Sequence, residues 1–359
     1  MAHDDFLRSI QRGGPCTGCG MSIQPALLLG ALSATQAVSG SELAQRLGVT
    51  RAAVWKQVEA LRALGAPIQA IAGRGYRLAW PLEPLDAARI HADLDAPLGK
   101  RLGELDVRWQ IESTSDALLL RAGEGTPDLS VCVAETQSAG RGRRGRTWSS
   151  PLGGNVYFSL LKRFSRGMGA LSGLSLVAGV ALIDALVDCG VAGVGLKWPN
   201  DALADGRKLA GILVELGGEF LGPCHAVIGV GINLRLRTDT LVDQPRIDQP
   251  RIDQPRIDQP CIDLAQLCAG TPPSRNLLIG RLASRLIAAL DRFAADGFSA
   301  LRADYARHDL LAGRAVRVQT PSGAREGIAD GVDERGALRV RHGAAVVCYD
   351  SAEVTVRGA

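Results

Sequence analysis

The residues best suited to chemistry lie in one short segment, Gly140–Trp148, which reads Gly-Arg-Gly-Arg-Arg-Gly-Arg-Thr-Trp. Its glycines match the G-x-G-x-x-G spacing of dinucleotide-binding loops, but turn-forming residues follow where that fingerprint requires a helix. Arginines and bare backbone N–H groups in a flexible loop suit the binding of a carboxylate or phosphate. Taken alone, the segment is equally consistent with a basic linker or a nucleic-acid patch.

Further polar motifs lie at the ends of predicted strands. They are Lys-Trp-Pro-Asn-Asp at 197–201, Arg-Lys-Leu-Ala-Gly-Ile-Leu-Val-Glu at 207–215 and Gly-Val-Gly-Ile-Asn at 229–233. The hydroxyl groups of residues 113–115 precede a predicted helix. No nucleophile–base pair, Gly-x-Ser-x-Gly, His-Glu-x-x-His or P-loop motif is evident. Each motif alone could be structural, but together they indicate charge neutralisation of phosphates.

The elements that must position these motifs form an α+β region over 81–311. Short apolar runs predict strands of one mixed sheet, with hairpins as well as crossovers. The expected strands are 131–134, 155–160, 195–198, 212–216 and 226–230, and the expected helices are 115–122, 172–189 and 274–295. Within this region, Asp-Gln-Pro-Arg-Ile recurs from 243, and residues 243–262 are interpreted as a low-complexity surface loop without a catalytic role.

Residues 21–80 predict a winged helix-turn-helix. Ser41 and Thr50 are expected N-caps of the second and third helices, and a hairpin follows. Between 41 and 80 there are six basic and two acidic residues, an excess as large as the formal charge of the whole chain, +4. We expect Arg51, Lys56 and Arg74 to contact DNA, although Trp55 stands where a polar base reader is usual. The alternative is a three-helix unit for docking or dimerisation.

The chain ends differ from the middle. Residues 1–20 are expected to be a disordered extension, or translation starts at Met21. Five short strands over 312–359 predict a small β-barrel. The longest apolar run, near 174–183, is shorter than the roughly 18 residues of a membrane span, and no secretory signal is recognisable. Cys16 and Cys19 lack a second pair at zinc spacing, so we expect no metal site, free thiols and a soluble, cytoplasmic protein.

The arginine loop and the three strand-end motifs, in this order, resemble the biotin protein ligases, also called biotin–[acetyl-CoA-carboxylase] ligases. The resemblance covers about 22–357 except the repeat. It implies a catalytic domain like that of class II aminoacyl-tRNA synthetases and a C-terminal SH3-like barrel. It also implies a two-step reaction in which the biotin carboxylate attacks the α-phosphate of ATP, with Mg²⁺ on the phosphates. A lysine of a biotin carboxyl carrier domain, of acetyl-CoA carboxylase or another carboxylase, then attacks the biotinyl-5′-adenylate.

The resemblance also implies roles for individual residues. Arg143, Lys208 and Lys197 would be catalytic, with Arg143 retaining the anhydride by ordering the loop. The expected biotin-binding residues are Ser113, Thr114, Ser115, Gln137, Arg141, Gly142, Arg143 and Lys208. The expected nucleotide-binding residues are Arg146, Trp148, Asn200, Asp201 and Asn233. Ser115 stands where the family has an asparagine, and its shorter side chain would lose or water-bridge one hydrogen bond to biotin. The loop is expected to be mobile when empty and ordered by ligand.

The N-terminal region further resembles the subclass that is both ligase and repressor of the biotin operon. This implies that adenylate binding promotes a homodimer, which places two helix-turn-helix units on operator DNA. Two alternatives remain open from the sequence. One is a ligase whose N-terminal domain does not regulate, and the other is a DNA-binding biotin sensor without ligase activity.

Overall fold

The structure is a computed structural model that describes residues 23–236, 260–320, 323–350 and 355–358. The chain forms two compact units, one of Met1–Ala63 with Pro67–Leu82 and one of Leu64–Ala66 with Glu83–Ala359. The expectations for 1–20, for Cys16 and Cys19, and for the repeat as far as residue 259 fall outside the described residues.

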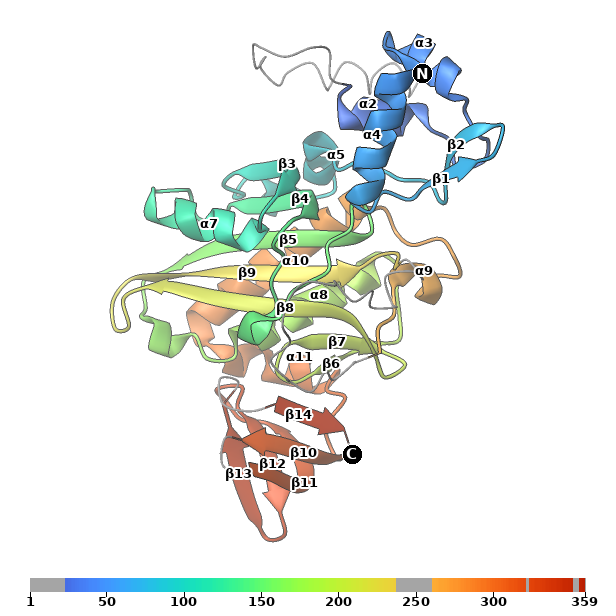
Figure 1. Cartoon of the computed structure of the whole chain (residues 1–359). Coiled ribbons are helices and arrows are strands. Elements are labelled where there is room, and N and C mark those ends of the chain that lie inside the picture. The colour runs from blue at the N-terminus through green and yellow to red at the C-terminus, as the bar shows by residue number, and fades with distance from the viewer. Residues whose placement is uncertain (1–22, 237–259, 321–322, 351–354, 359) are drawn as a thin grey trace. The chain divides into compact units, whose positions relative to one another are not determined.

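Over its described residues, the first unit holds three helices and a hairpin (Figure 1). These are α2 (Pro25–Ala31), α3 (Gly40–Leu47), α4 (Arg51–Ala63), β1 (Ile68–Ile71) and β2 (Gly75–Leu78). The N-cap of α3 is Ser39, not the expected Ser41, since the Ser39 hydroxyl accepts the Glu42 N–H and Glu42 stands at the capping-box position. Gly48 ends α3 in the left-handed region, with φ of 65°. Val54, Val58 and Leu61 form the buried side of α4. The predicted helix-turn-helix is therefore confirmed.

A seven-stranded mixed sheet forms the centre of the second unit. Its order is β3-β4-β5-β9-β8-β7-β6, and only the β3–β4 pair is parallel. The strands are β3 (Leu105–Ile111), β4 (Val131–Gln137), β5 (Asn155–Phe164), β6 (Val194–Lys197), β7 (Asp201–Ala204), β8 (Arg207–Gly218) and β9 (Cys224–Asn233). This confirms the α+β prediction, and β3 and β7 are strands that the sequence did not indicate.

Helices cover both faces of this sheet (Figure 1). On one face, α8 (Leu174–Asp188) and α10 (Arg275–Asp296) pack on β-strand residues such as Phe158 and Val230 in the main core. Because α8 contacts the sheet as well as α10 and α11, most of its residues are buried, which explains its apolar sequence. On the other face, α7 (Thr114–Gly123) packs through Leu118 in a smaller core. The short helices are α5 (Ala87–Ala92), α6 (Ala96–Gly99), α9 (Leu264–Leu267), α11 (Arg302–Ala306), and the 3₁₀ turns η2 (Arg143–Gly145), η3 (Met168–Ala170) and η4 (Phe298–Leu301).

The C-terminal residues form the five predicted strands. They are β10 (Ala315–Thr320), β11 (Gly323–Val332), β12 (Leu338–His342), β13 (Ala345–Tyr349) and β14 (Thr355–Gly358). All pair antiparallel in the order β13-β12-β11-β10-β14. A hydrogen bond of 3.0 Å from Trp198 Nε1 to the Gly336 carbonyl ties this sheet to the loop after β6. The antiparallel sheet is confirmed, whereas its closure into a barrel stays a prediction.

Candidate active site

The floor of the site is a glycine surface on the face of the sheet that carries α7. Side chains alternate along a strand, and the antiparallel register pairs Gly211 of β8 with Gly231 of β9. A Cβ atom on Gly231 would lie 2.6 Å from Trp148 Cε2, and one on Gly229 would lie 2.7 Å from Ser115 Oγ. The floor is therefore open only because these positions lack side chains, and it lets two polar or aromatic groups approach the backbone directly.

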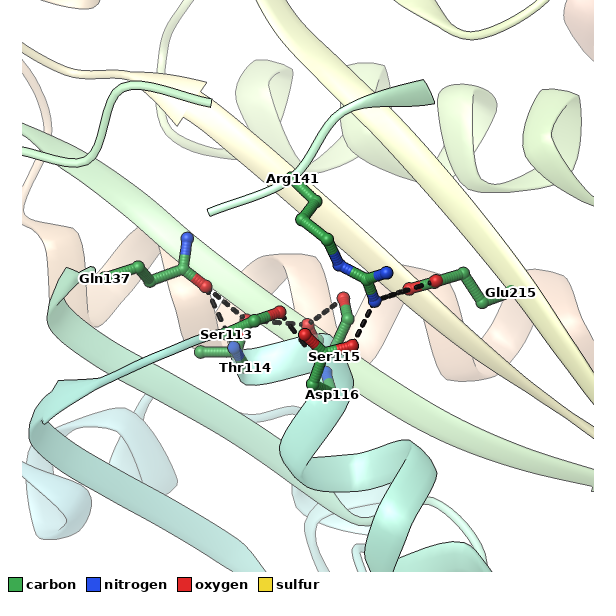
Figure 2. A network of polar contacts seen from close by, with 8 residues as sticks. Ser113, Thr114, Ser115, Asp116, Gln137, Arg141 and Glu215 are labelled. Carbon is green, nitrogen blue, oxygen red and sulfur yellow. Dashed lines mark hydrogen bonds and ion pairs between the residues drawn. The ribbon is translucent and has the colours of Figure 1, made fainter. Parts of the chain in front are cut away.

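A cluster of hydroxyl groups lies at one end of the floor (Figure 2). Ser113 caps α7 through the Asp116 N–H, which places Thr114 and Ser115 in the first turn. The Thr114 hydroxyl is 2.8 Å and the Ser115 hydroxyl 3.0 Å from Ser159 Oγ of β5. Hydroxyl groups can donate or accept, so this buried cluster can satisfy both the carbonyl and the N–H groups of a polar ring.

Gln137, at the end of β4, joins this cluster to the loop that follows it. Its Oε1 accepts hydrogen bonds from Thr114 N at 2.9 Å and from Thr114 Oγ1 at 3.1 Å. Its Nε2 donates to Ser150 Oγ at 3.2 Å. The predicted biotin-binding residues at positions 113–115 and 137 are therefore neighbours, although they come from two elements.

The arginine loop, residues 140–148, is closed by its own backbone. Gly142 N donates to Arg146 O at 2.7 Å, and Trp148 N donates to Gly140 O at 2.8 Å. Arg144 adopts a left-handed φ of 59° at the turn. The loop thus directs Arg141 and Arg143 to different parts of the site, whereas the side chain of Arg146 is exposed.

Arg143 points to the loop between β6 and β7. Its Nη1 donates to Asn200 Oδ1 at 3.1 Å, and Asn200 Nδ2 donates to Ile212 O at 2.9 Å. The pKa of Arg143 is lowered, mainly because the side chain is half-buried and next because the positive charge of Arg144 lies nearby. A half-buried cation beside other cations favours the arrival of an anion, because an anion relieves both desolvation and repulsion.

Lys208 meets the aromatic ring of Trp148 at the other end of the floor. Its Nζ is 2.7 Å from Asp201 Oδ1 and 5.7 Å from the centroid of the indole ring. The contact with Asp201 shows that the predicted Lys-Trp-Pro-Asn-Asp and Arg-Lys motifs come together. Lys197 lies opposite Asp201 in the β6–β7 pair, so it belongs to the same end.

Asn233 braces the backbone around Lys208. Its Nδ2 donates to Lys208 O at 3.2 Å and to Ile262 O at 3.1 Å. Lys208 N also donates to Pro260 O at 2.8 Å, so the last three residues of the repeat region pair with the start of β8 at Lys208. Residues 260–262 are therefore part of the framework that holds Lys208, a structural contribution that the interpretation of 243–262 as a surface loop without a catalytic role did not include.

Sequence reasoning missed three polar side chains that the structure brings into the site: Asp116, Ser159 and Glu215. Asp116 directly follows the hydroxyl motif, and Glu215 ends the motif at 207–215, so their positions in the sequence could have indicated a role in the site. Ser159 lies inside a predicted strand, and no nearby motif indicates a role for it. Conversely, Trp198 of the Lys-Trp-Pro-Asn-Asp motif is buried and faces the C-terminal sheet.

Across the described ranges, no group of three or more histidine, cysteine or acidic side chains is placed to hold a metal ion. Within the same ranges, no helix is long and apolar enough to cross a membrane.

Comparison with known proteins identifies the family. Residues 108–233 match the biotin/lipoate A/B protein ligase family, and residues 26–77 match an HTH domain. The chain is 37% identical to the bifunctional ligase/repressor BirA of Salmonella typhimurium over 93% of this chain and 98% of that protein. It is 33% identical to the biotin--[acetyl-CoA-carboxylase] ligase of Paracoccus denitrificans over 68% of this chain and 98% of that protein.

A solved structure agrees at the level of the fold. The biotin protein ligase from Aquifex aeolicus in complex with biotin and ATP superposes with a TM-score of 0.58 and 24% identity, covering 71% of this chain and 99% of that one. The fold and the family match together define a ligase of the biotin/lipoate type. The chain belongs to the biotin protein ligase family, in its bifunctional ligase/repressor class, as its match to BirA and its HTH domain show.

Proposed function

We propose that this chain activates biotin with ATP to biotinyl-5′-adenylate and transfers the biotinyl group to a lysine of a biotin carboxyl carrier domain. The observation that carries the proposal is one continuous glycine floor with a buried hydroxyl cluster at one end and a lysine at the other. The polar side chains of Ser113, Thr114, Ser115 and Gln137 at this end suit the polar ring of biotin. Lys208 suits the carboxylate and phosphate that must meet.

The chemistry requires positioning and cationic stabilisation, since a carboxylate and a phosphate are both anions. Lys208 and Arg143 would neutralise the reacting oxygens, with Lys197 a further phosphate cation. Trp148 would pack on the adenine, and Asn200 would orient the nucleotide through its contact with Arg143. Arg141, Gly142 and Arg146 would close the loop over the product and exclude water.

The proposed nucleotide end has one carboxylate next to the lysine. Asp201 pairs with Lys208 at 2.7 Å. Mg²⁺, when bound, would therefore be held mainly by phosphate oxygens of ATP, which is the usual mode for this ion. Asn233 acts at a distance in this proposal, since its amide braces the backbone of Lys208.

The finer architecture is part of the proposal. A winged helix-turn-helix would occupy 21–80, a catalytic domain like that of class II aminoacyl-tRNA synthetases 81–311, and an SH3-like barrel 312–359. The antiparallel pairing of β10 to β14 supports the barrel, with β13 and β14 the strands that must approach for closure. Cytoplasmic location and a homodimer in the adenylate-bound state are further elements of the proposal.

The repressor function depends on DNA contacts of the first unit. Arg51 and Lys56 are exposed on α4, and Arg74 is exposed in the hairpin turn. Trp55 is 60% exposed beside them. A large aromatic group on the face of a recognition helix suits contact with thymine methyl groups in the major groove. We therefore expect α4 to bind biotin operator DNA.

Two experiments test the proposal. Wild type should transfer labelled biotin to a carrier domain in an ATP-dependent way, whereas Arg143→Gly should release adenylate and label bystander proteins. Transfer of lipoate without transfer of biotin would overturn the substrate assignment. In a mobility-shift assay, DNA upstream of biotin-synthesis genes should be retarded only with biotin and ATP. Absence of that shift with normal transfer would leave a ligase that does not regulate.

A further inference from the structure

One arginine side chain spans the two sides of the site. Arg141 Nη2 donates to Glu215 Oε1 at 2.9 Å and to Glu215 Oε2 at 3.2 Å, and it also pairs with Asp116. Asp116 lies in the first turn of α7, and Glu215 lies in β8. Figure 2 shows the guanidinium group between the two carboxylates. We call these three side chains the carboxylate bar.

The carboxylate bar crosses the hydroxyl end of the floor. The sheet order places β9 between β5 and β8, and α7 packs on β5 and β9. A contact from α7 to β8 must therefore pass over β9, where Gly229 faces Ser115. The bar thus spans the hydroxyl cluster, and it ties the start of the arginine loop to both sides.

The carboxylate bar depends on the charge of each of its three side chains. Two carboxylates share one guanidinium group, so removal of Arg141 would leave two like charges near each other. Burial raises the pKa of Glu215, and the nearby Arg141 opposes this rise. The side chains of Arg141, Asp116 and Glu215 are 41%, 45% and 22% exposed, so each ion pair is partly solvated and of modest strength. Such contacts suit a closure that must reopen once per turnover.

We propose that Asp116 and Glu215 are positioning residues that hold Arg141, and with it the arginine loop, over the proposed biotin end of the site, and so set how long the acyl-adenylate stays bound. The inference rests on the proposed ligase function. Neither carboxylate needs to touch the reacting atoms. Their effect is on departure of the intermediate, because the loop must release Arg141 before the ligand can leave.

The test measures release of adenylate from the full-length protein. Adenylate is formed on the enzyme from labelled biotin and ATP, and its dissociation is followed after dilution into unlabelled biotin and ATP. Asp116→Asn and Glu215→Gln keep the shape of each side chain and remove its charge. Each variant should release adenylate about two- to fivefold faster than wild type, as expected for a partly exposed ion pair. Asp116→Glu should restore slow release.

A matched control is the pair of Asp188 and Arg285, which links α8 to α10 at 2.6 Å on the opposite face of the sheet. Asp188→Asn should leave adenylate release unchanged. A double-mutant cycle with Arg141→Gln adds a readout that a purely structural role would not move, because the effects of Asp116→Asn and Arg141→Gln should be clearly less than additive.

Several outcomes would overturn the inference. Unchanged release in both amide variants, equal acceleration by Asp188→Asn, or full additivity in the cycle would each show that the bar does not hold the loop. Raised salt should also speed release from wild type more than from Asp116→Asn, because salt screens the ion pair. Failure of wild type to form adenylate at all would instead refute the proposed function.

Discussion

Gly231→Ala is the most direct test of the glycine floor. The residue does not have a left-handed φ, so its backbone accepts alanine without strain. The new Cβ atom would lie 2.6 Å from Trp148 Cε2 and 2.8 Å from its Cζ2 and Nε1, closer than nonbonded carbon atoms approach. Because β9 is paired on both sides, with Tyr157 and with Gly211, the indole ring must move rather than the strand.

The magnitude follows from the cost of inserting one methyl group into a packed contact. Overpacking costs about 1–3 kcal/mol. If this free-energy cost falls entirely on nucleotide binding, the KM for ATP rises by about 5- to 150-fold. Loss of the contact between Lys208 and the ring adds to the effect. The KM for biotin should change far less, because the hydroxyl cluster lies at Gly229.

The assay is biotin-dependent exchange of pyrophosphate into ATP, with ATP and biotin varied separately. Gly211→Ala is the graded comparison, since its Cβ would lie 3.1 Å from Trp148 Cζ3 and 3.3 Å from Cε and Nζ of Lys208, and it should raise the KM for ATP less than Gly231→Ala does. In a Trp148→Ala background, Gly231→Ala should have little further effect. An unchanged KM for ATP, or an equal loss in the Trp148→Ala background, would refute the assignment of the indole ring to the nucleotide end.

Three further predictions concern the stability of the fold, the support of Lys208 in β8, and the binding of DNA. Glu135→Gln removes one partner of an ion pair with Arg275 that is 2.7 Å long and almost fully buried, so urea denaturation should show about 3–5 kcal/mol less stability. Asn233→Ala removes the amide that donates to the carbonyls of Lys208 and Ile262, although the Lys208 carbonyl keeps its hydrogen bond from Ile262 N. Thermal melting should show a loss of about 1–3 kcal/mol together with slower adenylation. Lys56→Ala should lower the slope of log affinity for operator DNA against log salt by about one, and an unchanged slope would place this residue outside the interface.

Local patterns in the sequence predicted most elements of the fold. Helices expected at 115–122, 172–189 and 274–295 are found at Thr114–Gly123, Leu174–Asp188 and Arg275–Asp296. Their apolar spacing and caps are properties of a few adjacent residues, so no tertiary information is needed. The Ser39 cap was missed because Ser41, two residues later, offers the same chemistry within one turn.

The strands that escaped prediction lie at or near the ends of the central sheet. β3 is an edge strand of mixed exposure, and β7 has four residues, so neither shows the long apolar run of β5 or β9. Their strand character comes from hydrogen bonding to neighbours that are distant in sequence. The sheet order itself, with β9 between β5 and β8, could not be read from any local pattern.

By itself, the sequence determined which functional groups this protein has: an arginine loop, lysine motifs and glycines, in a fixed order that identifies a biotin protein ligase. Only the tertiary structure decided which of these groups meet. Arg141 and Glu215 are 74 positions apart, yet register and sheet order bring them to 2.9 Å. Trp198 turns to the C-terminal sheet, and Asn233 turns to the backbone of Lys208. Such contacts depend on the pairing of distant strands, because a strand carries its side chains to alternate faces and only the pairing fixes their partners.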